Sequence, residues 1–170
     1  SKISFAGAGI AALATSKANI AEVKKSLTIQ TIGYDKLNQL RHIRFYKNKQ
    51  GIMEHMMKQA EILRPKFEAV EEILDNELSG LGIGTWTKPL GGYFITFETL
   101  EGCATSVVKK AKEAGVVLTG AGAPFPYGTD PRDFVIRIAP SYPTLEELRQ
   151  AAEVFVLCVK LASVEKLLEA

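Results

Sequence analysis

Lys2 is the first residue whose type and surroundings could do chemistry. It stands beside Ser1 and shortly before the small-residue turn Ala6-Gly7-Ala8-Gly9. A lysine amine forms Schiff bases with carbonyl groups, and the backbone N–H groups of a glycine-rich turn can bind a phosphate. A solvated surface lysine has the same pattern, so Lys2 alone supports both interpretations.

Arg137 is the second such residue. It lies inside the apolar run 135–139, where strand alternation places Val135 and Arg137 on one face. A guanidinium in a strand needs acceptors for its planar set of N–H donors. A substrate carboxylate would bind it in bidentate fashion, and an internal salt bridge to Asp or Glu would also satisfy it. The residues alone leave both possibilities open.

Other candidate residues carry weaker signals. Gly7 and Gly9 have the spacing of half a dinucleotide-binding fingerprint, but its third glycine and its acidic residue do not follow. The uncharged Gly- and Pro-rich loop 119–128 suits either a surface connection or close approach of backbone to a ligand. We expect His42 and His55 on a helix surface or at an interface, because no ligand or nucleophile partner is evident.

The first half of the chain is expected to be mainly helical. Short helical segments are expected at 10–14, after Asn19 and after Asp35, where the polar residues would act as N-caps. The apolar stripe of 51–78 predicts one long helix, ended by Gly80 and Gly82 and kinked or interrupted at Pro65.

Strands alternate with helices in the second half. The expected strands are 85–87, 92–97, 116–118 and 134–138, and a helix is expected over 104–114. Thr144 and Glu147 have the spacing of a capping box at the start of a final helix. The sequence therefore predicts an α/β fold, with a domain boundary near residue 57.

The composition fits a globular chain with a core. Of 170 residues 46% are hydrophobic and 24% charged, which excludes a disordered, collagen-like or coiled-coil protein. A net charge of +2, from 21 Lys and Arg against 19 Asp and Glu, gives no sign of a nucleic-acid or membrane partner. Cys103 and Cys158 lack metal-ligand spacing, so we expect no metal site. We expect a protein whose cysteines are reduced and which is located in the cytoplasm. The start at Ser1 without Met suggests a fragment of a longer chain.

Four motifs, in this order and spacing, resemble the C-terminal part of the fold-type I pyridoxal-phosphate aminotransferases: Ser1-Lys2, Lys88–Phe94, the run 115–128 and Ile136–Ser141. Segments 30–33, 36–42 and 62–67 resemble the bacterial aspartate aminotransferase subgroup, often described as similar to MocR-type aminotransferases. The resemblance covers essentially the whole chain. It implies that residues 1–57 end the large cofactor domain. Residues 58–170, with the long connecting helix, would form the small C-terminal α+β domain.

The resemblance also implies a role for particular residues. Lys2 would hold pyridoxal 5′-phosphate as a Schiff base and move the proton between the substrate α-carbon and the cofactor, and Ser1 would help to position the phosphate. Arg137 would bind the substrate α-carboxylate. Tyr93 would line the substrate entrance, and Arg41 would reach the neighbouring subunit's site to bind a distal carboxylate.

Two features depart from a complete enzyme of this kind. Ile10 stands where many members have an arginine that binds the cofactor phosphate. The family's residues that pair with the pyridine nitrogen and stack on its ring all precede the lysine. The 170 residues alone are therefore predicted to be inactive.

The activity implied for the intact protein is transamination between aspartate or glutamate and a 2-oxo acid, by a cytoplasmic homodimer without nucleic-acid or membrane partners. An alternative is the aminotransferase-like, ligand-sensing domain of a transcriptional regulator, without transaminase activity. A structural module in which Lys2 and Arg137 are incidental is a third interpretation.

Overall fold

The structure is a computed structural model that describes residues 3–4 and 7–169. The chain divides into two compact units, unit 1 from Ser1 to Ala60 and unit 2 from Glu61 to Ala170. The division falls inside the long helix α3 (Lys49–Leu78), which contains Pro65 and remains one helix across it. The single long helix is confirmed, although it begins at Lys49 rather than at residue 51.

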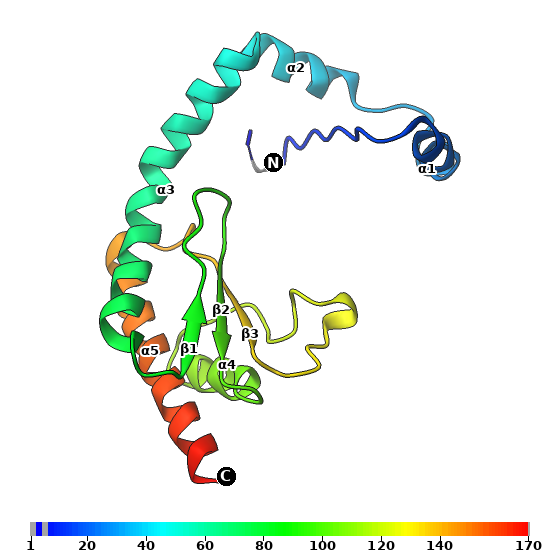
Figure 1. The fold of residues 1–170 in the computed structure, drawn as a ribbon. Helices are drawn as coiled ribbons and strands as arrows, with labels where there is room; N and C mark the ends of the chain where they lie inside the picture. Colours follow the sequence, from blue (N-terminus) through cyan, green and yellow to red (C-terminus); the bar gives the residue numbers. More distant parts are fainter. Residues whose placement is uncertain (1–2, 5–6, 170) are drawn as a thin grey trace. The chain divides into compact units, whose positions relative to one another are not determined.

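Unit 1 contains α1 (Lys17–Gln30), α2 (Lys36–Tyr46) and the first part of α3 (Figure 1). Asp35 caps α2 as predicted, because its side chain accepts a hydrogen bond from the backbone N–H of Asn38. Ser16, not Asn19, caps α1, and its side chain accepts from Asn19 N. The helix expected at 10–14 is wrong: these residues have no regular structure. Five residues form too few hydrogen bonds to offset helix nucleation without a packed partner.

Unit 2 is built on a three-stranded antiparallel sheet in the order β1 (Gly84–Trp86), β2 (Ile95–Thr99), β3 (Val135–Ile138). The remaining elements are α4 (Ala104–Glu113), the 3-10 turn η1 (Pro126–Gly128) and α5 (Leu145–Leu168). Figure 1 shows α4 and α5 beside this sheet together with the end of α3.

The core of unit 2 lies between one sheet face and the three helices. Ile95 and Phe97 of β2 and Ile136 of β3 are almost completely buried there, with Leu74 of α3 and Val159 of α5. The Phe97 ring meets the Phe155 ring edge to face at 5.1 Å. The alternate residues of β2 and β3 therefore belong to the other sheet face.

The strand expected at 116–118 is wrong. Val116, Val117 and Leu118 belong to no strand, and 82% of the Val117 surface is exposed. Val116 N donates to Ala111 O, so this segment continues the end of α4 rather than joining the sheet. A short apolar run does not by itself specify a strand, because sheet formation needs a paired neighbour.

Two expectations about helix ends in unit 2 are confirmed. Thr144 and Glu147 form a complete capping box at the start of α5. Gly115 follows α4 with φ of +90°, and Gly80 follows α3 with φ of +79°.

Among the described residues, no helix is long and apolar enough to span a bilayer.

Candidate functional site

Arg137 lies on the face of the sheet opposite the hydrophobic core. In the register of β2 and β3, Arg137 pairs with Thr96, while Ile138 pairs with Ile95 and Ile136 with Phe97. The last two pairs are buried against the helices. The alternation predicted from the sequence is therefore correct, and it leaves the Arg137 side chain on the side of the sheet that the helices do not cover.

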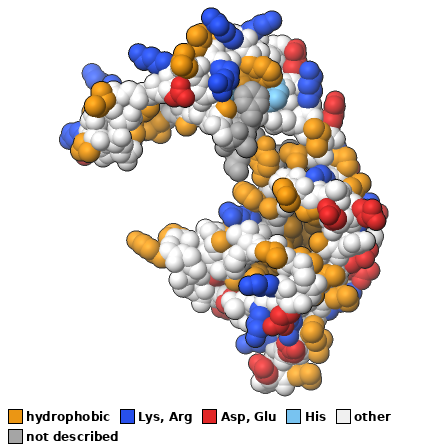
Figure 2. Space-filling view, turned by 180° about the vertical axis from the view of Figure 1, so that it is seen from behind, with side chains coloured by type: hydrophobic (Ala, Val, Ile, Leu, Met, Phe, Trp, Pro, Cys, Tyr) orange, Lys and Arg blue, Asp and Glu red, His pale blue; other side chains and the backbone are white. Residues whose placement is uncertain are grey.

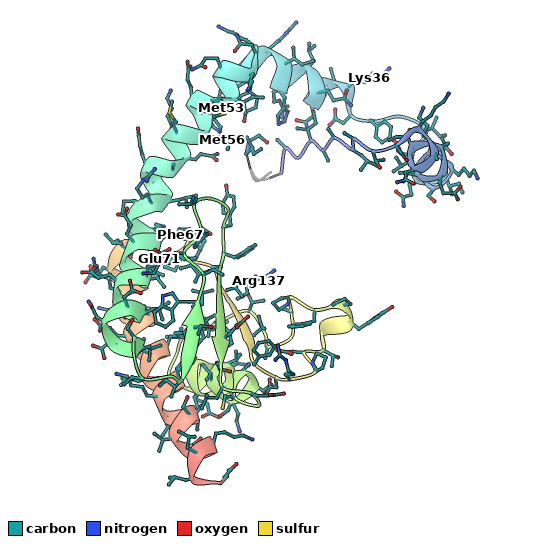
Figure 3. The ribbon with its side chains drawn as sticks, viewed as in Figure 1. Lys36, Met53, Met56, Phe67, Glu71 and Arg137 are labelled. Atoms are coloured by element: carbon teal, nitrogen blue, oxygen red, sulfur yellow. The ribbon has the colours of Figure 1, made fainter. Side chains whose placement is uncertain are left out.

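The Arg137 guanidinium lies over the Phe94 ring. The guanidinium carbon is 4.4 Å from the centre of the ring, which is a cation–π arrangement. This contact uses the charge of the guanidinium and not its N–H donors, which bind acceptors in the guanidinium plane. Figure 3 labels Arg137 within this part of unit 2.

The donors of Arg137 are not used by an internal acid. The Nε atom is buried and has no hydrogen-bond partner. Within residues 3–4 and 7–169, no Asp or Glu lies within ion-pair distance of Arg137. The internal salt bridge that the sequence left open is therefore absent from the described part of the chain, and the arrangement is suited to an external carboxylate.

The loop that carries Tyr93 and Phe94 is tied to α3. The Lys88 ammonium and the Asp75 carboxylate form an ion pair of 2.5 Å. Burial raises the pKa of the nearby Glu71 carboxyl, and the positive charge of Lys88 acts in the opposite direction. Figure 3 shows Glu71 on the side of α3 that faces the β1–β2 hairpin. The ion pair links the start of this loop to α3.

The other predicted site residues are distributed over both units. Tyr93 is half-buried and directly precedes Phe94, so the structure brings it into the neighbourhood of Arg137. Arg41 is exposed on α2 of unit 1. Lys2 and Ser1 lie outside the described residues.

The residues that follow Lys2 are held by α2 and α3. Tyr46 Oη donates to Ile3 O at 3.3 Å, and Gln59 Nε2 donates to Ser4 O at 3.0 Å. Burial raises the pKa of the Tyr46 hydroxyl, whereas its hydrogen bond with Ser4 lowers it. Ser4 itself is buried. The backbone of Ile3 and Ser4 is thus held by hydrogen bonds from two helices.

A cavity of about 650 Å³ adjoins this segment within unit 1, and it is lined mainly by apolar side chains, among them Ile3, Ile10, Ile43 and Ile52. His42 also lines it. His42 is buried rather than exposed on the helix surface, which was one of the two positions expected for it, and its Nδ1 lies 2.8 Å from Asn38 O. Within the described residues, no group of His, Cys, Asp and Glu could hold a metal ion.

The small net charge of the chain conceals an uneven distribution. Residues 1–60 contain ten Lys and Arg against three Asp and Glu, and residues 61–170 contain eleven against sixteen. Figure 2 shows Lys and Arg prevailing among the charged side chains of unit 1 on the face drawn. A positive field of this kind favours anions such as phosphate and carboxylate.

Comparison with known proteins identifies the family. A family profile described as aspartate amino-transferase matches residues 1–170. The chain belongs to the aspartate aminotransferase family. It is 45% identical over 168 residues to an aminotransferase of Mycolicibacterium smegmatis and 44% identical over 165 residues to the aspartate aminotransferase of Corynebacterium glutamicum. These matches cover 99% and 97% of this chain but only 39% and 38% of the two relatives.

A solved structure confirms the fold. The crystal structure of an aspartate transaminase from Corynebacterium glutamicum matches with a TM-score of 0.82 and 43% sequence identity. The match covers 89% of this chain and 36% of that chain. The predicted α/β fold of a fold-type I aminotransferase is therefore correct, and the chain spans less than half the length of its aminotransferase relatives.

Sequence reasoning missed Phe94, although it included the neighbouring Tyr93. The signal was weak, because an aromatic residue at the start of a strand is ordinarily a packing residue.

Proposed function

We propose that these residues are the C-terminal part of a pyridoxal-phosphate-dependent aminotransferase. The full-length protein transfers an amino group between aspartate or glutamate and a 2-oxo acid. The observation that carries this proposal is Arg137: a guanidinium held on a sheet by Phe94, with a buried Nε that has no acceptor. The names of the relatives favour this function over a ligand-sensing regulatory domain.

The described residues fit part of a pyridoxal-phosphate site. Tyr46 and Gln59 fix the backbone of Ile3 and Ser4, directly after Lys2. In the proposed enzyme Lys2 holds the cofactor and moves the proton at the substrate α-carbon, and Ser1 helps to position the phosphate. When bound, the cofactor supplies the electron sink for amino-group transfer. Ile10 offers no charge for the phosphate, so its ligands come from other groups.

The remaining residues act on the substrate. Arg137 binds the α-carboxylate that every amino-acid and 2-oxo-acid substrate shares, and its planar donors fix the direction of that carboxylate. Tyr93 lines the entrance beside it. Arg41 binds a distal carboxylate in the site of a neighbouring subunit, which accounts for its exposed position on α2.

The proposal extends to the assembly. Residues 1–57 belong to the large cofactor domain and 58–170 to the small domain, and the enzyme works as a homodimer in the cytoplasm. The 170 residues alone are inactive, because the resemblance places the other cofactor-binding residues in the part of the relatives that this chain does not match.

A transamination assay on the full-length protein with aspartate and 2-oxoglutarate tests this function. Arg137→Leu removes the proposed carboxylate ligand and is expected to lower kcat/KM by about 100-fold, since removal of a buried charge partner costs about 2–5 kcal/mol. Arg132→Leu is the matched control, because Arg132 also stacks on an aromatic ring, at 3.9 Å from Phe134, but on another segment. Unchanged kcat/KM in Arg137→Leu, or no transamination by the wild-type protein, would contradict the proposal.

A further inference from the structure

Lys66 ties α3 to the turn that follows β3. Its ammonium donates hydrogen bonds to Ser141 O at 2.9 Å and to Pro143 O at 2.5 Å. The side chain is half-buried. Hydrogen bonds from Thr144 lower the pKa of the Glu147 carboxyl, and the charge of Lys66 adds to this shift. A charged donor makes stronger hydrogen bonds than a neutral one, so both carbonyls are firmly held.

The turn held by Lys66 begins where the Arg137 strand ends. Ser141 is four residues after Arg137, and the intervening Pro140 is almost completely buried. Pro140 and Pro143 each have a restricted φ, so the turn is stiff. A shift of its carbonyl groups would therefore also move the end of β3. The position of the two carbonyls is thereby coupled to the end of β3.

A cavity lies beside the end of β3. A cavity of about 140 Å³ lies against Arg137, Ile138 and Ala139, with Val70 and Leu148 on its helix side. Atoms that line a cavity lose the van der Waals contacts that a packed neighbour would provide. The hydrogen bonds of Lys66 therefore help to hold this end of the strand beside the cavity.

We propose that Lys66 is a positioning residue for substrate binding: it holds the β3–α5 turn and so keeps Arg137 in place for the α-carboxylate. The proposal rests on the proposed function of Arg137. Lys66 does not touch the substrate. Its removal affects the binding of the amino donor and of the 2-oxo acid to the same extent, because both present the same carboxylate to Arg137.

Steady-state kinetics of the full-length enzyme test the proposal with Lys66→Met and Lys66→Arg. Lys66→Met leaves two carbonyls without their donor and is expected to raise KM about tenfold for both substrates, with kcat changed less than about twofold. Lys66→Arg keeps a charged donor and is expected to restore most of the loss. A merely structural role would instead lower the melting temperature and leave both KM values unchanged.

Lys160→Met is the matched control. Lys160 also joins α5 to α3, through an ion pair of 2.7 Å with Glu77, but it does not contact the turn after β3. We expect this variant to keep the wild-type KM values. An equal rise of KM in Lys160→Met and Lys66→Met, or no rise in Lys66→Met, would overturn the proposal.

Amide hydrogen exchange separates this proposal from the proposed function. Exchange of the Ile136 and Ile138 amides, which face β2 in the sheet, is expected to be faster in Lys66→Met than in the wild-type protein and unchanged in Lys160→Met, whether or not the protein transaminates. Wild-type exchange rates in Lys66→Met would overturn the positioning role. Faster exchange in a protein without transaminase activity would overturn the proposed function, and with it the role in substrate binding.

Discussion

The Phe94 ring lies against the Arg137 guanidinium at 4.4 Å from ring centre to guanidinium carbon. Phe94 directly precedes β2, and Arg137 is paired with Thr96 of that strand. The ring and the strand together restrict the position of the guanidinium. A carboxylate then meets donors that are already oriented, and little side-chain entropy remains to be lost on binding.

Replacement of Phe94 tests this arrangement. Phe94→Leu keeps an apolar side chain but removes the aromatic face, and KM for amino and 2-oxo acids is expected to rise about three- to tenfold, in line with the strength of cation–π contacts. Phe94→Tyr keeps the face and is expected to retain the wild-type KM. Equal KM values in Phe94→Leu and the wild-type enzyme would show that the ring does not orient Arg137.

Asp130 makes the start of β3 sensitive to acid. Its carboxylate accepts hydrogen bonds from the backbone N–H groups of Arg132, Phe134 and Val135 at 3.0, 2.8 and 2.9 Å. Burial acts to raise the pKa of Asp130, but these three bonds outweigh it and hold the pKa below its ordinary value. A lowered folded-state pKa stabilises the fold above the unfolded-state pKa, and this contribution is lost as pH falls through the folded-state pKa.

Urea unfolding of Asp130→Asn measures that contribution. The variant is expected to be less stable than the wild-type protein by about 1.5–3 kcal/mol at pH 7, the range for hydrogen bonds to a charged acceptor. The difference should shrink in acid, as pH falls through the lowered folded-state pKa and the wild-type carboxyl also becomes protonated. A difference that stays constant throughout acid titration would show that the charge of Asp130 is not responsible.

Gly122 lies at a point in loop 119–128 where two parts of the backbone approach closely. Its φ is +82°, and a Cβ atom there would lie 2.2 Å from Gly128 O. Gly122→Ala is therefore expected to lower the free energy of unfolding by at least about 1–2 kcal/mol, the cost of a left-handed conformation for a residue with a Cβ. Gly120→Ala is the control, since nothing lies within 4 Å of a Cβ at that position. Equal stability of the two variants would contradict the structure of this loop.

The two cysteines are expected to react slowly in the native protein. Cys103 and Cys158 are both buried, and burial raises the pKa of each thiol. A thiol with a raised pKa supplies little thiolate, which is the reactive form. Titration with a thiol-specific chromogenic reagent should show slow modification of both in buffer and rapid modification in denaturant. Rapid reaction of either thiol without denaturant would contradict its burial.

Local signals predicted those parts of the fold that depend on neighbouring residues. Asp35 and the pair Thr144 and Glu147 act at helix starts through contacts three residues away, and each was identified correctly. The prediction of Asn19 as the N-cap of α1 was wrong, because Ser16, three residues earlier, can also cap a helix and its side chain is the one that does so. The apolar run at Val117 was misread because whether it joins a sheet depends on a distant partner strand.

The site was predictable only in part for the same reason. Strand alternation showed that Arg137 lies on the face away from Ile136 and Ile138, but not what covers its guanidinium. The contact with Phe94 depends on the register of two strands separated by more than thirty residues. The contact of Lys66 with Ser141 joins residues 75 positions apart, and no local pattern encodes it.

The central claim is that Lys2 holds pyridoxal phosphate in an aminotransferase whose substrate carboxylate binds Arg137. Borohydride reduction of the full-length, cofactor-supplemented protein, followed by mass spectrometry of the peptide that contains Lys2, tests it most directly. The account predicts a pyridoxyl group on Lys2 and loss of the absorbance of the bound cofactor on reduction. An unmodified Lys2 in folded, cofactor-supplemented protein would contradict it.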